Sequence, residues 1–279
     1  MGFKVEHPRI IQGGMGIAVS SWKLASAVSR RGQLGVVSGT GMDVVLARRL
    51  QLGDIGGHIR DALAAFPIRD MADRVAARYF VEGGKPPDAP FKSKPIPSIR
   101  PPRALVELMI IANFVEVHLA KRGHGGVVGI NLLEKIQIPT LPSLFGAMLA
   151  KVDFVLMGAG IPRAIPAVLD RLASLDSVSL KLDVSGAKSG EEFCATFDPR
   201  EFLPEEKESL TRPNFLAIIS SSALATTLAR KSTGKVDGFV VEGRTAGGHN
   251  APPRGQLVLS ESGEPVYGPR DEVDLAQIR

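Results

Sequence analysis

Short apolar runs, each followed by small residues and then by a helical pattern, repeat along most of the chain. Because β-branched runs bounded by glycine or serine are typical of buried strands, this rhythm predicts parallel strands joined by helices. The predicted strands are residues 9–12, 34–38, 127–132, 154–157, 178–184, 215–220 and 238–241.

Helical periodicity fills most of the intervals between these strands. Ser20 and Ser21 are expected to open a helix that stops near Gly32, and Asp43 is expected to cap the next one. Further helices are predicted at 104–121, 165–173 and 222–230. Residues 53–103 break the rhythm: we interpret them as an inserted excursion with a helix at 71–82 and a proline-rich stretch at 85–102.

Small or polar residues follow most of the predicted strands, where parallel barrels place their active sites. The pattern therefore favours an α/β fold of the TIM (β/α)8 type. A doubly wound open sheet produces a similar pattern and stays an alternative at this point.

Composition is consistent with one large domain spanning residues 1–279, because 44% of the residues are hydrophobic and 23% are charged. The net charge of +5 is spread along the chain without a Lys/Arg run, and aromatic residues are 5%. We therefore expect no nucleic-acid partner. A phosphate-bearing cofactor or an anionic substrate explains mild basicity equally well.

The single cysteine, Cys194, lies in a polar stretch at 190–200 that is predicted to be a loop or helix start. One thiol cannot form an internal disulfide, and no signal-peptide pattern opens the chain, so a cytoplasmic protein is expected. The most apolar segment, 104–120, includes Glu107 and Glu116, which predicts a partly buried helix and no membrane span.

Four candidate sites follow predicted strands or lie in them. The first is the cluster Gln12, Gly13, Gly14, Met15 and Gly16, whose glycines let the backbone approach a flat or anionic ligand. It lacks the spacing of a dinucleotide-binding fingerprint, and a plain tight turn explains it equally well. The second is Asn131, whose amide either bonds neighbouring backbone or a ring such as uracil.

The third candidate is Lys181, within an apolar predicted strand; pointing inward it would need an anion, and on an edge strand it would point to solvent. The fourth is the run Ala246, Gly247, Gly248 and His249 after the last predicted strand. A neutral imidazole at this position can exchange a proton with carbon at neutral pH, although a lone histidine is usually structural. No metal-ligand spacing, phosphate-binding loop or serine elbow is present in the sequence.

Three segments together resemble the nitronate monooxygenase (2-nitropropane dioxygenase) family and the related FMN-dependent enoyl-thioester reductases. They are residues 8–16, 129–132 and 242–249, which are spread over the chain in the family's order. The Ala-Gly-Gly-His run is the most specific of the three.

The resemblance implies an FMN-binding barrel in which His249 is the catalytic base. Gly14, Met15 and Gly247 would contact the flavin through their backbones, Gly248 belongs to the same loop, and Asn131 would hydrogen-bond the ring. Glu242 occupies a position where the family often has glutamine. Lys181 would face the pyrimidine edge of the flavin.

Two departures leave alternatives open. The family commonly continues His-x-Gly, whereas this chain has Asn250, Ala251 and Pro252, which is closer to reductases acting on enoyl thioesters. The family also has two further strands, so the barrel is expected to be incomplete here and completed by a C-terminal segment or a second chain. A non-catalytic partial barrel that serves as an interaction module, and a homo-oligomer, are further alternatives.

Overall fold

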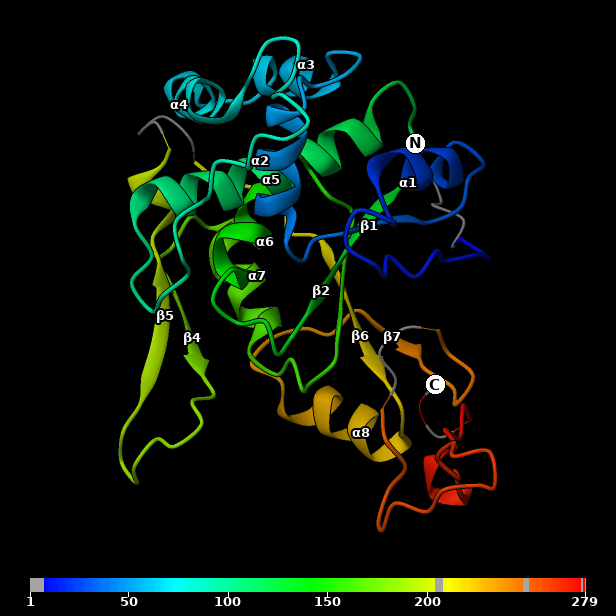
Figure 1. Cartoon of the computed structure of the whole chain (residues 1–279). Coiled ribbons are helices and arrows are strands. Elements are labelled where there is room, and N and C mark those ends of the chain that lie inside the picture. The colour runs from blue at the N-terminus through cyan, green and yellow to red at the C-terminus, as the bar shows by residue number, and fades with distance from the viewer. Residues whose placement is uncertain (1–7, 204–207, 248–250, 277, 279) are drawn as a thin grey trace, which may run out of the picture.

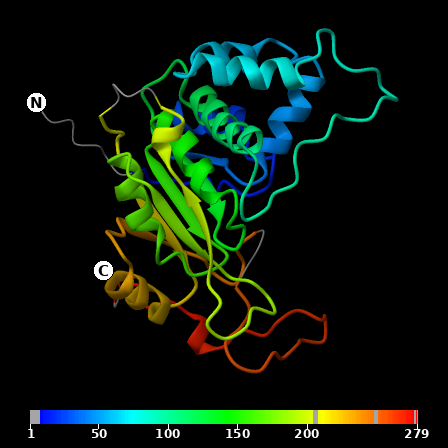
Figure 2. The same ribbon diagram turned by 90° about the vertical axis from the view of Figure 1, so that its left-hand side faces the viewer.

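The computed structural model describes residues 8–203, 208–247, 251–276 and 278, which form a mixed α/β structure around a parallel five-stranded sheet (Figures 1 and 2). Its strands are β1 (Gly35–Ser38), β2 (Val128–Leu133), β3 (Phe154–Gly158), β6 (Asn214–Ile219) and β7 (Gly238–Val241). The helices are α1 (Trp22–Ser29), α2 (Met42–Gln51), α3 (His58–Ala64), α4 (Arg69–Tyr79), α5 (Arg103–Lys121), α6 (Thr140–Leu149), α7 (Ile165–Ala173) and α8 (Ser222–Lys231).

The strands lie side by side in the order in which the chain makes them, β1-β2-β3-β6-β7. All four pairings are parallel, and their register places Ser38 beside Asn131 and Ile219 beside Val241. Strand order therefore never reverses across this sheet. A doubly wound sheet reverses its order at a switch point, so the described topology lacks the defining feature of that alternative.

The two faces of the sheet are covered differently. One face contributes Val37, Ile130, Val155 and Phe215 to a large core that also contains residues from every helix, α1 to α8. The opposite face forms a smaller cluster whose members come from the strands or from the residues directly before them: Leu34, Val36, Val127, Phe154, Leu156, Leu216, Ile218 and Val240. In the described part of the chain, the helices thus pack on one face of the sheet.

A sixth segment extends the sheet beyond β1. Ile11 forms an isolated parallel bridge with Leu34, and the Gln12 N–H donates to the Leu34 carbonyl oxygen at 3.0 Å. The first predicted strand, 9–12, therefore occupies the expected place beside β1 but makes a single bridge instead of a full strand.

The prediction that residues 178–184 belong to the parallel series is wrong. They contain β4 (Val178–Leu182), which pairs antiparallel with β5 (Phe193–Phe197) in a separate two-stranded sheet. Strand β3 pairs directly with β6 instead. The physical reason is visible in the burial: Ser179 and Lys181 are exposed between buried neighbours, as in an antiparallel hairpin, whereas the parallel strands β1 to β3 are almost continuously buried.

Strand β5 also corrects the loop or helix start predicted at 190–200. Cys194 lies in this strand opposite Lys181 and is exposed. A short 3-10 helix, η1 (Pro199–Glu201), follows β5, and a second, η2 (Pro269–Asp271), lies near the C-terminal end.

The excursion at 53–103 packs against α5, the long helix at the centre of the helical layer. It contains α3, which periodicity missed, and α4, which matches the helix predicted at 71–82 but begins at Arg69. Arg74 of α4 forms two hydrogen bonds to the buried carboxylate of Glu107 in α5, at 2.7 and 3.1 Å. No helix in the described chain is long and apolar enough to cross a membrane.

The N-termini of α1 and α2 are not capped as the sequence predicts. The α1 N-terminus is held by Glu116 of α5, whose Oε1 accepts from the Trp22 N–H at 2.7 Å, while the Ser20 hydroxyl turns to the Met15 carbonyl oxygen. The N-cap position of α2 is Gly41, and Asp43 lies in its first turn, paired with Lys94. Contacts distant in sequence therefore replace the local caps that the sequence predicts.

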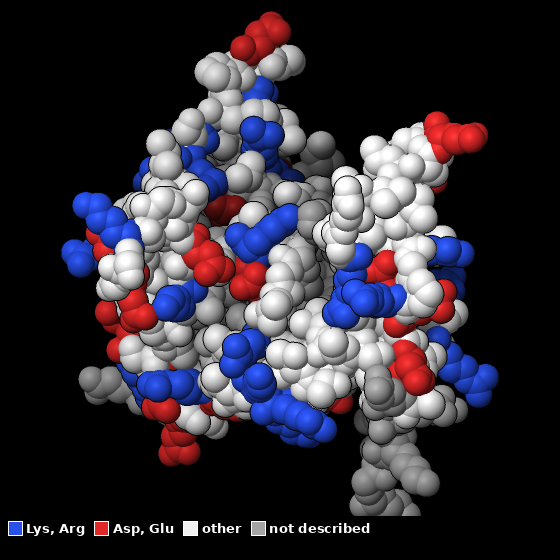
Figure 3. Space-filling model, turned by 90° about the horizontal axis from the view of Figure 1, so that it is seen from below, with Lys and Arg blue, Asp and Glu red and all other residues white. Residues whose placement is uncertain are grey.

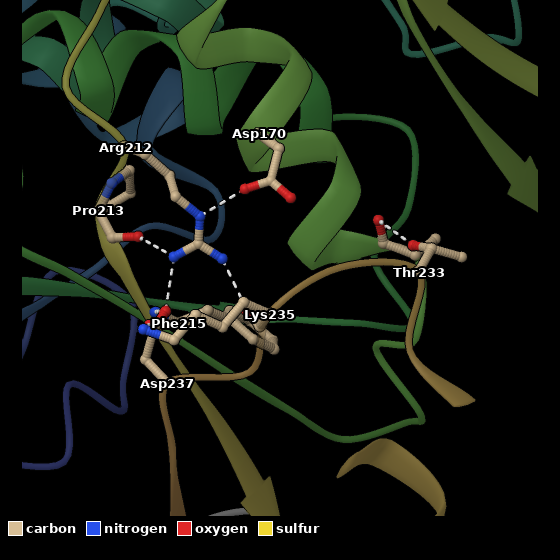
Figure 4. Close-up of polar contacts among 8 residues, drawn as sticks. Asp170, Arg212, Pro213, Phe215, Thr233, Lys235 and Asp237 are labelled. Atoms are coloured by element: carbon tan, nitrogen blue, oxygen red, sulfur yellow. Dashed lines mark hydrogen bonds and ion pairs between the residues drawn. The ribbon is translucent and has the colours of Figure 1, made fainter. Parts of the chain in front are cut away.

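The amino ends of β6 and β7 are fixed by the guanidinium of Arg212 (Figure 4). It donates to Asp170 of α7 at 2.6 Å and to Asp237, directly before β7, at 2.5 Å. Burial opposes ionisation of Asp237, but hydrogen bonds from Lys235, the Phe215 N–H and Arg212 outweigh it and lower the Asp237 pKa. Ion pairs thus stabilise the amino end of the sheet, and the carboxyl end carries the candidate site.

Candidate functional site at the carboxyl edge of the sheet

The carboxyl edge of the parallel sheet gathers the small and polar residues that follow its strands. In Figure 1 the arrowhead of β6 points down, so Figure 3, seen from below, looks toward this edge. The surface there is hollowed, and both basic and acidic side chains lie around the hollow (Figure 3). Carboxyl ends of parallel strands are the usual place for ligand sites in such folds.

The glycine loop and Asn131 meet at this edge. The Asn131 Nδ2 donates to the Gly13 carbonyl oxygen at 2.7 Å and approaches the Met15 Sδ at 3.5 Å. Gly14 is buried and has φ of +70°, and a Cβ on it would lie 2.4 Å from Val36 Cγ1 and 2.9 Å from Asn131 Cβ. Only glycine fits this backbone conformation and this space without strain.

Gln12 and Ser20 hold the two ends of this loop against β1. The Gln12 Oε1 accepts from the Val36 N–H at 2.9 Å, and its Nε2 donates to the Ser20 Oγ at 3.1 Å. The Ser20 Oγ in turn donates to the Met15 carbonyl oxygen at 2.5 Å. The sequence placed Gln12 at the head of the glycine cluster and Ser20 at the start of a helix, but it did not predict that their side chains hold the loop.

Some backbone N–H groups of this loop make no hydrogen bond within the described chain. In the described part of the chain, neither the Gly14 N–H nor the Met15 N–H has a hydrogen-bond acceptor. Gly14 is buried, and a buried backbone donor is costly without a partner, so its N–H points to a ligand or bound water. Met15 is half-buried.

Glu134, which sequence reasoning missed, lies at the same edge directly after β2. Its N–H donates to the Gly158 carbonyl oxygen at 2.9 Å, and a Cβ on Gly160 would lie 1.8 Å from Glu134 Oε2. Burial raises the Glu134 pKa; a hydrogen bond from Gln137 opposes this, and the charge of Asp183 adds to it. A half-buried carboxyl with a perturbed pKa beside the ends of parallel strands is a candidate for a functional group. An acidic residue soon after a strand was the signal.

Glu242 lies at the carboxyl end of β7, two strands from β3 in the sheet order. It is half-buried, its N–H donates to the Ile219 carbonyl oxygen at 2.7 Å, and it lines a cavity of about 610 Å³. Gly247 follows in an exposed loop, with open space where a Cβ would stand. Gly248 and His249 lie outside the described residues.

The segment 251–276 folds back over the start of α8. The Arg254 Nη2 donates to the Ser221 Oγ at 2.5 Å, and the Asp274 N–H donates to the Ser222 Oγ at 3.0 Å. Asp271 accepts from the backbone N–H groups of Gly268 and Arg254, which lowers its pKa. A side chain near one end of this segment and a backbone N–H near the other therefore anchor it at the carboxyl end of β6.

Lys181 is not where the prediction placed it. It lies in the β4–β5 hairpin, outside the parallel sheet, with a side chain that is 66% exposed. Its Nζ pairs with the Glu192 Oε1 at 2.8 Å, and this hydrogen bond and charge raise the Lys181 pKa. The solvent-facing alternative is the correct one for this lysine.

The structure thus brings Gly14, Met15 and Asn131 into one place and puts Glu242 at the same edge of the sheet. Among the described residues, no group of histidine, cysteine and carboxylate side chains could hold a metal ion. Compared with known proteins, the chain matches no family model and no curated protein.

Proposed function

We propose that the chain is an FMN-dependent oxidoreductase of the nitronate monooxygenase type, built on the wall of a (β/α)8 barrel. Two features of the described fold support the barrel: the strands follow one another in chain order, and the helices pack on one face of the sheet. A barrel has both properties, because its strands close in sequence around an inner face lined by strand residues.

The observation that supports a bound cofactor is the arrangement of Gly14, Val36 and Asn131, here called the Gly14–Asn131 cradle. The Gly14 backbone presses against Val36 and Asn131, and its N–H and that of Met15 lack acceptors in the described chain. Polar edges of a flat ring present acceptor atoms that such donors match. The residues present therefore fit a flavin, with Gly14 and Met15 donating from the backbone.

Asn131 acts in this proposal as a positioning residue as well as a ring contact. Its amide nitrogen already donates to the Gly13 carbonyl oxygen, so it holds the glycine loop in the shape that aims the free donors. Gly247 and Glu242 would approach the cofactor from β7. Lys181 takes no part, because it lies in the exposed hairpin.

When bound, FMN supplies an acceptor for the electrons that leave the substrate. His249 would take the proton from the carbon next to the nitro group and hold it as imidazolium, a role suited to a group whose ordinary pKa is close to neutrality. Its place in the sequence, directly after the two glycines that follow β7, motivates this assignment.

Oxygen uptake by the FMN-loaded chain in the presence of an alkyl nitronate tests the activity. We expect uptake that depends on both FMN and nitronate. A parallel assay with an enoyl thioester and NAD(P)H tests the other activity that the resemblance implies. Turnover there without nitronate-dependent uptake would replace the proposed activity, and a chain that binds no flavin would favour the non-catalytic interaction module.

A further inference from the structure

A second cavity, of about 510 Å³, lies beside the carboxyl ends of β1 and β2. Its walls come from the loops that follow these two strands and from two segments outside the strand–helix rhythm, the excursion and the end of β4. Val44 of α2 and Met109 of α5 also line it, and both helices belong to the layer on the helical face. The cavity shares no lining residue with the Gly14–Asn131 cradle.

The walls of this cavity are mostly apolar. Its apolar lining residues are Val44, Pro97, Ile99, Met109, Ile136, Ile138, Pro139, Leu182 and Val184. Three of them expose about two fifths of their surface: Ile99 (41%), Ile136 (42%) and Val184 (41%). Apolar side chains from three distant segments that converge around one hollow indicate a binding site. The volume lies within the range of roughly 300–1,000 Å³ typical of small-molecule sites.

The charges in the lining balance. Lys94 and Lys135 carry two positive charges, and Asp43 and Asp183 carry two negative ones. The Lys94 Nζ lies 2.9 Å from the Asp43 Oδ2, and both side chains are largely buried. This ion pair fixes the ammonium while using one of its three donors. A neutral ligand oxygen can accept from such a group, whereas an added carboxylate would crowd Asp43 and Asp183.

We propose that this cavity binds an uncharged, elongated apolar molecule that bears one oxygen acceptor, such as an alkyl ester. The apolar chain packs along Ile99, Ile136 and Val184, and the oxygen accepts from the Lys94 ammonium. The site is distinct from the flavin cradle, because the two share no lining residue.

Calorimetric titration of the whole chain with methyl decanoate, decanoate and decylamine tests the proposal. We expect the ester to bind and each charged analogue of similar chain length to bind at least about tenfold more weakly, a difference of about 1.4 kcal/mol. Absence of ester binding, or equal binding of either charged analogue, would overturn it.

Two wall variants locate the site. Ile136→Asp and Val184→Asp change partly exposed residues on different segments, so each is expected to fold and to weaken ester binding at least about tenfold. Ile96→Asp is the control. Ile96 is 85% exposed and lies in the excursion that contributes Pro97 and Ile99 to the wall, but it does not itself line the cavity. Two results would contradict this location. One is that Ile136→Asp and Val184→Asp leave ester binding unchanged. The other is that Ile96→Asp weakens ester binding as much as they do. Thermal unfolding of each variant checks the fold.

Discussion

The amide nitrogen of Asn131, in β2, lies 2.7 Å from the carbonyl oxygen of Gly13, which is 118 residues earlier in the chain. This hydrogen bond joins the glycine loop before β1 to the carboxyl edge of the sheet. Asn131 is buried, so its side-chain amide has little access to water. The bond to Gly13 gives this amide N–H an acceptor that it would otherwise lack. The proposed flavin cradle depends on this contact.

Replacing Asn131 by leucine is expected to lower the free energy of unfolding by about 1–3 kcal/mol, because the Gly13 carbonyl oxygen loses its partner. Loss of the loop's position should also weaken FMN binding about tenfold. Urea unfolding and flavin titration measure the two effects. Asn214→Leu is the control, since Asn214 is exposed at the amino end of β6; equal losses in both variants would show that the Asn131 contact has no special role.

Gly14 and Gly13 form a matched pair for a test of the cradle's geometry. Gly14→Ala is expected to destabilise the fold by about 2 kcal/mol, because it combines a positive φ with a clash against Val36. Gly13→Ala should change stability little, since a Cβ there meets nothing within 4 Å. Denaturant midpoints give the comparison, and similar midpoints for the two variants would show that the close approach is wrong.

The strand segments of the parallel sheet could be predicted from sequence because they are continuously apolar and end in small residues. The β4–β5 hairpin could have been predicted in part: Val178, Leu180 and Leu182 alternate with Ser179 and Lys181, which is the signature of a strand with one exposed face. Its partner β5 alternates in the same way, with Phe193, Ala195 and Phe197 separated by Cys194 and Thr196, but it follows a polar stretch and was predicted to be a loop or helix start.

The site could be predicted residue by residue but not as an assembly. Gly14, Met15 and Asn131 could be singled out individually, yet their contact depends on which strands are neighbours, and local periodicity does not encode that. The cavity beside Ile136 could not be predicted for the same reason, because its walls come from an excursion and a hairpin that approach each other only in the folded chain.

The Asp237 cluster predicts a pH dependence of stability. The folded-state pKa of Asp237 is lowered, so its contribution is fully present above the ordinary aspartate pKa of about 3.9 and is lost as the pH falls through the lower folded value. Urea unfolding between neutral and acid pH should therefore show a loss in the wild type that Asp237→Asn lacks. Parallel curves for the two proteins would contradict the assignment.

Within this cluster, Arg212→Met should destabilise the fold at neutral pH by about 1–3 kcal/mol, because it leaves the largely buried Asp237 with fewer partners. Arg230→Met, in the exposed last turn of α8, is the comparison for removing an arginine. Thermal unfolding midpoints measure both, and an equal effect of the two substitutions would argue against the special role of Arg212.

His249→Ala is expected to leave FMN binding intact and to lower turnover with the neutral nitroalkane, whose α-proton must be removed, by roughly 10²–10⁴-fold, the usual contribution of one acid–base group. Steady-state oxygen uptake measures turnover, and flavin titration of the same sample serves as its control. Turnover equal to that of the wild type would remove His249 from the mechanism.

Flavin titration of the purified chain tests the central claim most directly. The account predicts that FMN binds in equal molar ratio with quenched fluorescence, that Gly13→Ala binds it as the wild type does, and that Gly14→Ala binds it at least about tenfold more weakly. A chain that leaves FMN fluorescence unchanged, or a Gly14→Ala variant with wild-type affinity, would contradict a flavin site at the Gly14–Asn131 cradle.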